Sequence, residues 1–165
     1  MAPVLTFAMT AAITPGPNNI ILSTNAVNYG FKETIPLMMG VFFGFLSILT
    51  LCLLGIGELY KSFPAIAMIV KIVATCFLVY LSFRIFTSSS FSDEKNSKKF
   101  SFKDIFFFQI INPKAVTVSM SSSAIFIQNK FSYQIEFILI FLCFVISTST
   151  SAIAWAAIGH SFRKY

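Results

Sequence analysis

The sequence predicts an all-α integral membrane protein with about five membrane-spanning helices. Hydrophobic residues make up 56% of the 165 residues, charged residues only 11%, and the mean hydropathy is +0.82. Soluble domains carry about 25% charged residues, which keep their surfaces hydrated. Because this chain has too few charges to cover such a surface, much of it must face lipid. The apolar residues also fall into separate stretches long enough to cross ~30 Å of hydrocarbon.

The expected spans form one polytopic domain over residues 1–165. The first two are uncharged, the third contains Lys71 and Arg84, the fourth contains Lys114, and the fifth has Glu136 near its start. In chain order, the spans cover about residues 2–24, 35–57, 64–86, 104–127 and 133–158.

The basic residues predict the orientation of these spans. Lys61 and Lys130 would lie on one side of the membrane, and a larger group on the other: Lys32, Arg84, Lys95, Lys98, Lys99, Lys103, Arg163 and Lys164. Cytoplasmic loops carry the excess of Lys and Arg. We therefore expect the N-terminus outside and a cytoplasmic loop at residues 87–103. Basic residues gathered between apolar stretches are typical of loops at an anionic membrane surface, so the net charge of +6 does not indicate nucleic-acid binding.

The residues that carry enzyme and metal chemistry are sparse. Cys52, Cys76 and Cys143 are far apart and form no C-x-x-C, which argues against a zinc site and against a membrane oxidoreductase that passes electrons through paired cysteines. His160 is the single histidine, and no Ser/His/Asp grouping or phosphate-binding glycine loop is visible. The sequence predicts no enzyme, no cofactor and no metal site.

The first span is interrupted near its middle by the motif Thr14-Pro15-Gly16-Pro17-Asn18-Asn19. Proline removes a backbone donor and frees carbonyl groups. Inside a membrane such backbone is tolerated only where protein or a watery cavity satisfies it. We expect Thr14 to cap a second half-helix with Pro15 at its first position. Asn18 and Asn19 would then place amides near the bilayer centre, where they are costly unless they bind something.

The fourth span contains a second break of this kind at Asn112-Pro113-Lys114, where Asn112 is a natural N-cap. The two breaks lie in spans that would run in opposite directions, the pattern of a 3+3 inverted repeat with a midplane site. Half-helix N-termini can receive a carboxylate, and Lys114 would add a charge beside them. Prolines also kink membrane helices for packing alone, but two breaks with polar residues at matching positions favour a site.

Other polar and small residues are less specific. Gly40 and Gly44 form a Gly-x-x-x-Gly motif typical of helix contacts. Most of the hydroxyl residues 147–151 are expected to serve packing, with one face of them as a candidate lining of the site. Trp155 and His160 are expected to anchor the fifth span at the membrane interface.

Together these motifs resemble the LysE/RhtB family of amino-acid exporters. The resemblance rests on Thr14-Pro15-Gly16-Pro17-Asn18, Gly30-Phe31, Gly40 with Gly44, and Asn112-Pro113-Lys114, and it covers nearly the whole chain. It implies a multi-pass protein of the bacterial inner membrane that moves amino acids outward, with protons as the coupling ion. By position, Thr14 to Asn18 and Asn112 to Lys114 would surround the transport path. The closing Trp155 and Gly159-His160 resemble exporters of cysteine or O-acetylserine.

The chain departs from the family pattern at its end. Members of the family continue through a sixth span, whereas this sequence ends at Tyr165, so the resemblance implies a chain lacking the last transmembrane helix. Two alternatives follow: a homo-oligomer that completes the bundle, or a truncated, non-transporting membrane protein or interaction subunit.

The expected substrate is a neutral amino acid. Glu33, Glu58, Asp104 and Glu136 all lie at the ends of spans. A cationic side chain at low dielectric would need an anion beside it, and none is available deep in a span. Homoserine, threonine, leucine or cysteine-like substrates therefore fit better than lysine or arginine.

Overall fold

A computed structural model describes residues 1–56, 100–128 and 130–163, together with Met68, Ile72, Cys76 and Val79. The described residues are mainly helical, and none of them lies in a β-strand. Most of the expected third span at 64–86 and most of the expected loop at 87–103 lie outside the described residues, as do Lys61, Lys71 and Arg84. The elements are α1 (Ala2–Ile13), α2 (Pro17–Tyr29), α3 (Phe31–Leu51), the π-helical turn η1 (Cys52–Ile56), α6 (Phe102–Ile111), α7 (Pro113–Phe126) and α8 (Tyr133–Ser161).

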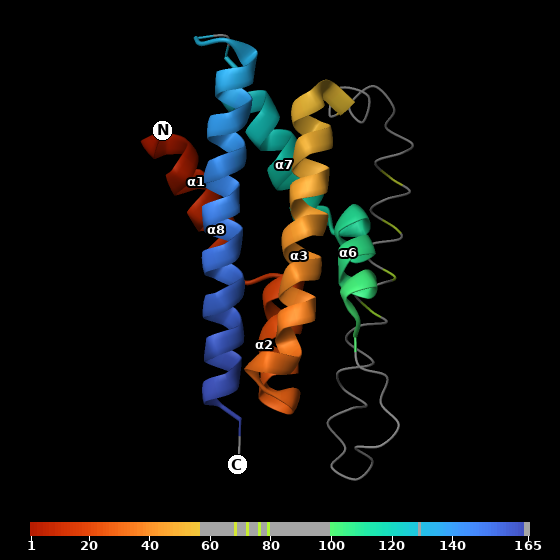
Figure 1. Cartoon of the computed structure of the whole chain (residues 1–165). Helices are drawn as coiled ribbons and strands as arrows, with labels where there is room; N and C mark the ends of the chain where they lie inside the picture. Colours follow the sequence, from red (N-terminus) through yellow and green to blue (C-terminus); the bar gives the residue numbers. More distant parts are fainter. Residues whose placement is uncertain are drawn as a thin grey trace.

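Two long helices form the centre of the part of the bundle that the structure describes. The segments Phe31–Gly55, with 25 residues, and Tyr133–Ser161, with 29 residues, are each long and apolar enough to cross a membrane. They pack side by side and run in opposite directions (Figure 1). The first segment ends where Gly55 adopts φ 96°, a left-handed conformation that glycine adopts readily and other residues do not.

The remaining helices of the described residues form two consecutive pairs, and a proline break separates the two helices of each pair. In Figure 1, α1 and α2 descend from the N-terminus, whereas α6 and α7 ascend toward the start of α8. Helices α1 and α2 pack against α8, and α6 packs along α3. The two broken segments therefore run in opposite directions on the scaffold made by α3 and α8.

The predicted contact motif at Gly40 and Gly44 holds α3 against α6. A Cβ atom added at Gly40 would lie 2.8 Å from the Phe102 carbonyl oxygen, and one added at Gly44 would lie 2.6 Å from Cγ of Gln109. No side chain fits at either distance, so only glycine permits this approach. The interpretation of the motif as a helix contact is confirmed.

The start of α2 differs from the expectation. Thr14 does not cap it and Pro15 is not its first residue: α2 begins at Pro17, with Gly16 as the N-cap in an extended conformation (φ −166°, ψ 177°). A residue that precedes proline is excluded from the α region, so Pro17 prevents Gly16 from being helical. Pro17 then takes the first helical position, where no N–H is needed. The Thr14 hydroxyl instead donates to the Thr10 carbonyl at the end of α1 (2.6 Å).

Candidate functional site

The second break has the predicted cap. Asn112 is extended (φ −72°, ψ 109°) because it precedes Pro113, and its side-chain oxygen accepts a hydrogen bond from the Lys114 backbone N–H at 3.1 Å. Asn112 is 1% exposed, so this cap lies within the protein. The start of α7 is thereby fixed with the Lys114 side chain leaving its first turn.

A cluster of three amide side chains joins the two breaks. The side chains of Asn18 and Gln109 donate to each other, at 2.9 Å in both directions. The Asn112 side-chain N–H₂ group completes the cluster by donating to Asn18 Oδ1 at 3.2 Å and to Gln109 Oε1 at 3.4 Å. Gln109 is fully buried, and its second donor reaches the Ile105 carbonyl at 3.0 Å. Buried polar groups that satisfy one another in this way make a network that resists separation.

The first break exposes the last carbonyl groups of α1, which have no partners within that helix. Side chains from three other elements satisfy them. The Ala12 carbonyl accepts from Asn19 Nδ2 (3.0 Å) and from the Ser151 hydroxyl (2.7 Å). The Thr14 carbonyl accepts from the same Asn19 nitrogen (3.0 Å) and from the Lys114 amino group. Asn19, Ser151 and Lys114 therefore converge on the C-terminal end of α1.

Trp155, which the sequence predicts to be an interfacial anchor, also belongs to this arrangement. Its indole N–H donates to the Ile13 carbonyl at 3.2 Å, across 142 residues of sequence. The carbonyl that the first break frees in α1 attracts the indole, because an unpaired carbonyl inside a membrane protein is costly. His160 lies exposed in the last turn of α8.

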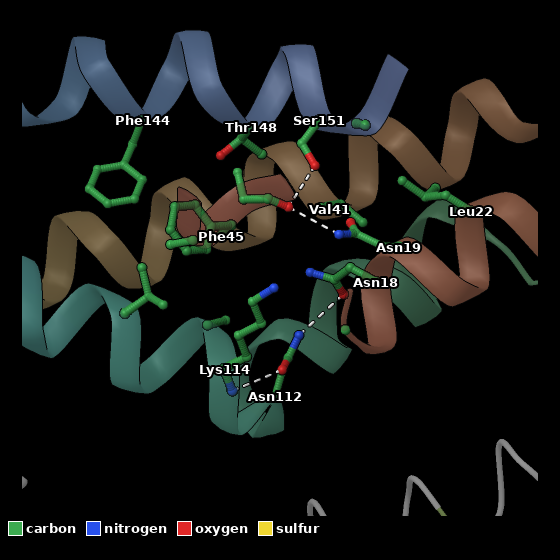
Figure 2. A pocket seen from close by; sticks show the side chains of 16 residues that line it. Asn18, Asn19, Leu22, Val41, Phe45, Asn112, Lys114, Phe144, Thr148 and Ser151 are labelled. Atoms are coloured by element: carbon green, nitrogen blue, oxygen red, sulfur yellow. Dashed lines mark hydrogen bonds between the residues drawn. The ribbon is translucent and has the colours of Figure 1, made fainter. Parts of the chain in front are cut away.

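A cavity with a volume of about 50 Å³ lies where these groups meet, large enough for a few water molecules or a small ligand. Figure 2 shows the Lys114 side chain pointing into it from α7, with Thr148 and Ser151 on the opposite side on α8. Its apolar walls are formed mainly by Leu22, Val41, Phe45 and Phe144. No Asp or Glu is among the described residues that line it.

The structure brings most of the expected site residues to this cavity. Gly16, Asn18, Asn19, Asn112 and Lys114 line it. The other four expected residues, Thr14, Pro15, Pro17 and Pro113, are not among its lining residues. The Thr14 carbonyl accepts from the Lys114 amino group, and Pro17 and Pro113 are the first residues of α2 and α7.

Sequence reasoning assigned no role to Gln109, which the structure places in the amide cluster between the two breaks. It predicted packing for most of the hydroxyl residues 147–151, and two of them, Thr148 and Ser151, line the cavity. The one available signal for Gln109 was its place three residues before Asn112, one helical turn away on the same face. The described residues contain no group of three or more His, Cys, Asp or Glu side chains that could hold a metal ion.

Several groups at the cavity can stabilise negative charge. Two helix N-termini, those of α2 and α7, begin at its wall and carry partial positive charge. Lys114 adds an amino group with three donors. A carboxylate would be stabilised here by these groups together.

Comparison with known proteins identifies the family of the chain. The family described as LysE type translocator matches residues 9–164. The chain is 26% identical over 170 residues to the cysteine/O-acetylserine efflux protein of Shigella flexneri serotype 5b, covering 99% of this chain and 87% of that protein. It is 26% identical over 160 residues to the protein of the same name in Escherichia coli K12, covering 96% of this chain and 82% of the relative. No solved structure matches the chain. The match to the family spans nearly the whole sequence, and the chain therefore belongs to the LysE type translocators, a family of membrane transporters.

Proposed function

We propose that the protein exports amino acids through the cavity between the two proline breaks. The substrate carboxylate would face the N-termini of α2 and α7 and the Lys114 amino group. The observation that carries this proposal is the convergence of both half-helix N-termini and Lys114 on one cavity. Free N–H groups and the helix dipole make such N-termini anion sites.

The arrangement of the broken helices supports an alternating-access mechanism. The segment α1–α2 and the segment α6–α7 run in opposite directions on α3 and α8 (Figure 1). Transporters built from 3+3 inverted repeats place discontinuous helices in this way around a midplane site. Rocking of one repeat against the other would then open the cavity to each side in turn. We infer five spans at about the expected boundaries, an N-terminus outside the inner membrane and protons as the coupling ion.

The walls of the cavity favour a small neutral amino acid. No carboxylate among the described lining residues would balance a cationic side chain. The small volume fits cysteine, homoserine or threonine better than leucine, and Thr148 offers a hydroxyl to a polar side chain. The relatives named for cysteine and O-acetylserine efflux support the same size class.

An efflux assay tests the proposal. The chain would be expressed in a bacterial strain without its own exporters, the cells loaded with dipeptides, and the amino acids in the medium measured. We expect export of a small neutral amino acid, and a loss of about tenfold in Lys114→Met, equivalent to one ionic hydrogen bond of ~1.4 kcal/mol. Lys103→Met, which removes an exposed lysine of α6, is the matched control. No export despite membrane insertion would instead favour a non-transporting subunit.

A further inference from the structure

We propose that the C-terminal carbonyl groups of α1 form a subsite for the primary ammonium group of the substrate, and that Lys114 occupies this subsite while the site is empty. This inference rests on the proposed function. It assigns the part of the site that would bind the positively charged group of the substrate. It also gives the Lys114 amino group two alternative partners, the Thr14 carbonyl and the substrate carboxylate.

The two poles follow from the directions of the helices that meet at the cavity. Helix α1 ends there with its carbonyl groups, so it contributes partial negative charge, whereas α2 and α7 begin there with partial positive charge. The oxygens of Ala12 and Thr14 lie close together, because a single Asn19 nitrogen is 3.0 Å from both. An amino acid has the same two poles, an ammonium group and a carboxylate, on one carbon atom.

The carbonyl oxygens are the strongest acceptors offered to an ammonium group at this place. No Asp or Glu lines the cavity among the described residues, so a cation must bind to neutral oxygens. The Ala12 and Thr14 carbonyls carry the dipole of α1, and the Ser151 hydroxyl, 2.7 Å from Ala12 O, lies beside them. Thr148, 8% exposed, adds a hydroxyl that has no hydrogen-bond partner among the described residues.

Lys114 shows what kind of group this subsite accepts. Its side chain leaves α7, passes Gly16 and donates to the Thr14 carbonyl, 100 residues away in sequence. The approach is close: a Cβ atom added at Gly16 would lie 3.0 Å from Lys114 Cδ and 3.2 Å from its Nζ. A lysine amino group and the α-ammonium group of an amino acid present the same three N–H donors. The protein therefore already places an ammonium-type donor on the carbonyl end of α1.

This arrangement implies an exchange of partners when substrate binds. The substrate ammonium can take the Thr14 carbonyl only if Lys114 leaves it. The displaced Lys114 then needs an anion, and the substrate carboxylate supplies one. An amine without a carboxylate supplies no anion for the displaced Lys114 amino group, so it should bind poorly. Release of the substrate would return Lys114 to Thr14.

The experiment compares three ligands on the purified full chain by equilibrium binding under reducing conditions. The ligands are L-cysteine, cysteamine, which lacks the carboxylate, and 3-mercaptopropionate, which lacks the ammonium group. In the wild type we expect cysteamine to bind about tenfold more weakly than cysteine, the effect of losing a charge-assisted bond. In Lys114→Met the competing group is gone, so the affinity for cysteamine should rise about tenfold while that for 3-mercaptopropionate falls. Lys114→Arg, which keeps a cation, should still bind cysteamine more weakly than cysteine.

The outcomes separate this inference from the proposed function. If Lys114→Met weakens cysteine binding but leaves cysteamine binding unchanged, Lys114 contacts only the carboxylate, and the ammonium subsite is wrong although the transport site stands. If the variant changes the binding of none of the three ligands, the proposed function fails as well.

A ligand measurement on the wild type covers the case in which Lys114→Met does not fold. The N,N,N-trimethyl derivative of cysteine keeps the positive charge but has no N–H donor, so we expect about tenfold weaker binding than for cysteine. Equal binding of the two would overturn the subsite.

Discussion

Asn18 of α2 and Gln109 of α6 form a reciprocal amide pair, in which each side-chain N–H₂ group donates to the oxygen of the other at 2.9 Å. The pair joins the start of one half-helix to the end of another across 91 residues of sequence. Asn112 donates to both oxygens, so the pair also holds the cap of α7. The two breaks are therefore positioned by one polar network, and any motion that separates them must open it.

Replacing Gln109 by leucine should weaken this junction. The change removes the acceptor of the Asn18 side-chain N–H₂ group and one of the two acceptors of the Asn112 N–H₂ group, at a cost of about 1–3 kcal/mol. We expect a lower thermal unfolding temperature in detergent and reduced efflux. Gln134→Leu, an exposed position on α8, is the matched control. Equal unfolding temperatures for the two variants would show that the amide network does not stabilise the fold.

Gly159 sets the packing of α8 on α2. A Cβ atom added there would lie 2.6 Å from Cα and 2.8 Å from the backbone carbon of Ser23. Because backbone cannot move aside as a flexible side chain can, Gly159→Ala should separate the two helices and cost about 1–3 kcal/mol. Thermal unfolding checks this, with Ala157→Ser on the exposed face of α8 as the control. An unchanged unfolding temperature would contradict the tight contact.

Glu136 should matter for the connection between α7 and α8. The residue is 6% exposed, and its carboxylate accepts backbone N–H groups of Gln128 and Lys130 at 2.9 Å and of Phe131 at 3.2 Å. Glu136→Ala removes the acceptor of all three donors, and we expect about 1–3 kcal/mol of destabilisation. Proteolysis near residue 130 should become faster in the variant.

Glu136→Gln keeps one side-chain acceptor and should lie between wild type and Glu136→Ala in protease resistance. If Gln and Ala variants are cleaved at the wild-type rate, the carboxylate does not order this segment.

The sequence could predict the features of this fold that depend on local chemistry. Proline has no N–H to donate, so the breaks near Pro17 and Pro113 could be located, and Asn112 before Pro113 could be recognised as a cap. The start of α2 was placed wrongly because two prolines competed for its first position, and the restriction that Pro17 imposes on Gly16 decided the outcome.

The partners of the freed carbonyls could not be predicted in this way. Ser151 and Trp155 reach Ala12 and Ile13 across more than a hundred residues, and Gln109 meets Asn18 across 91. These pairings depend on how α8 and α6 pack against the broken helices, which no local pattern specifies. A hydroxyl in a span is equally compatible with packing and with a role in the site.

The Lys114 side chain lies close to Gly16 and donates to the Thr14 carbonyl. The extended φ of −166° at Gly16 suits any residue, so valine should be tolerated by the backbone. Its side chain would occupy the space of Lys114 Cδ and Nζ, which lie 3.0 and 3.2 Å from an added Cβ. We expect Gly16→Val to lower cysteine efflux about tenfold with little change in unfolding temperature, since a displacement of about 1 Å at a site can cost a factor of this size or more.

A double-mutant cycle with Lys114→Met tests the cause of this loss. If valine acts by displacing the lysine side chain, it should reduce efflux no further once that side chain is gone, and the two effects should be far from additive. A further tenfold loss in the Lys114→Met background would mean that valine blocks the cavity or distorts the break by itself. Gly16→Ala, with a single methyl group, should show the same non-additivity at smaller amplitude, because the flexible end of Lys114 needs to shift by only a few tenths of an ångström to make room.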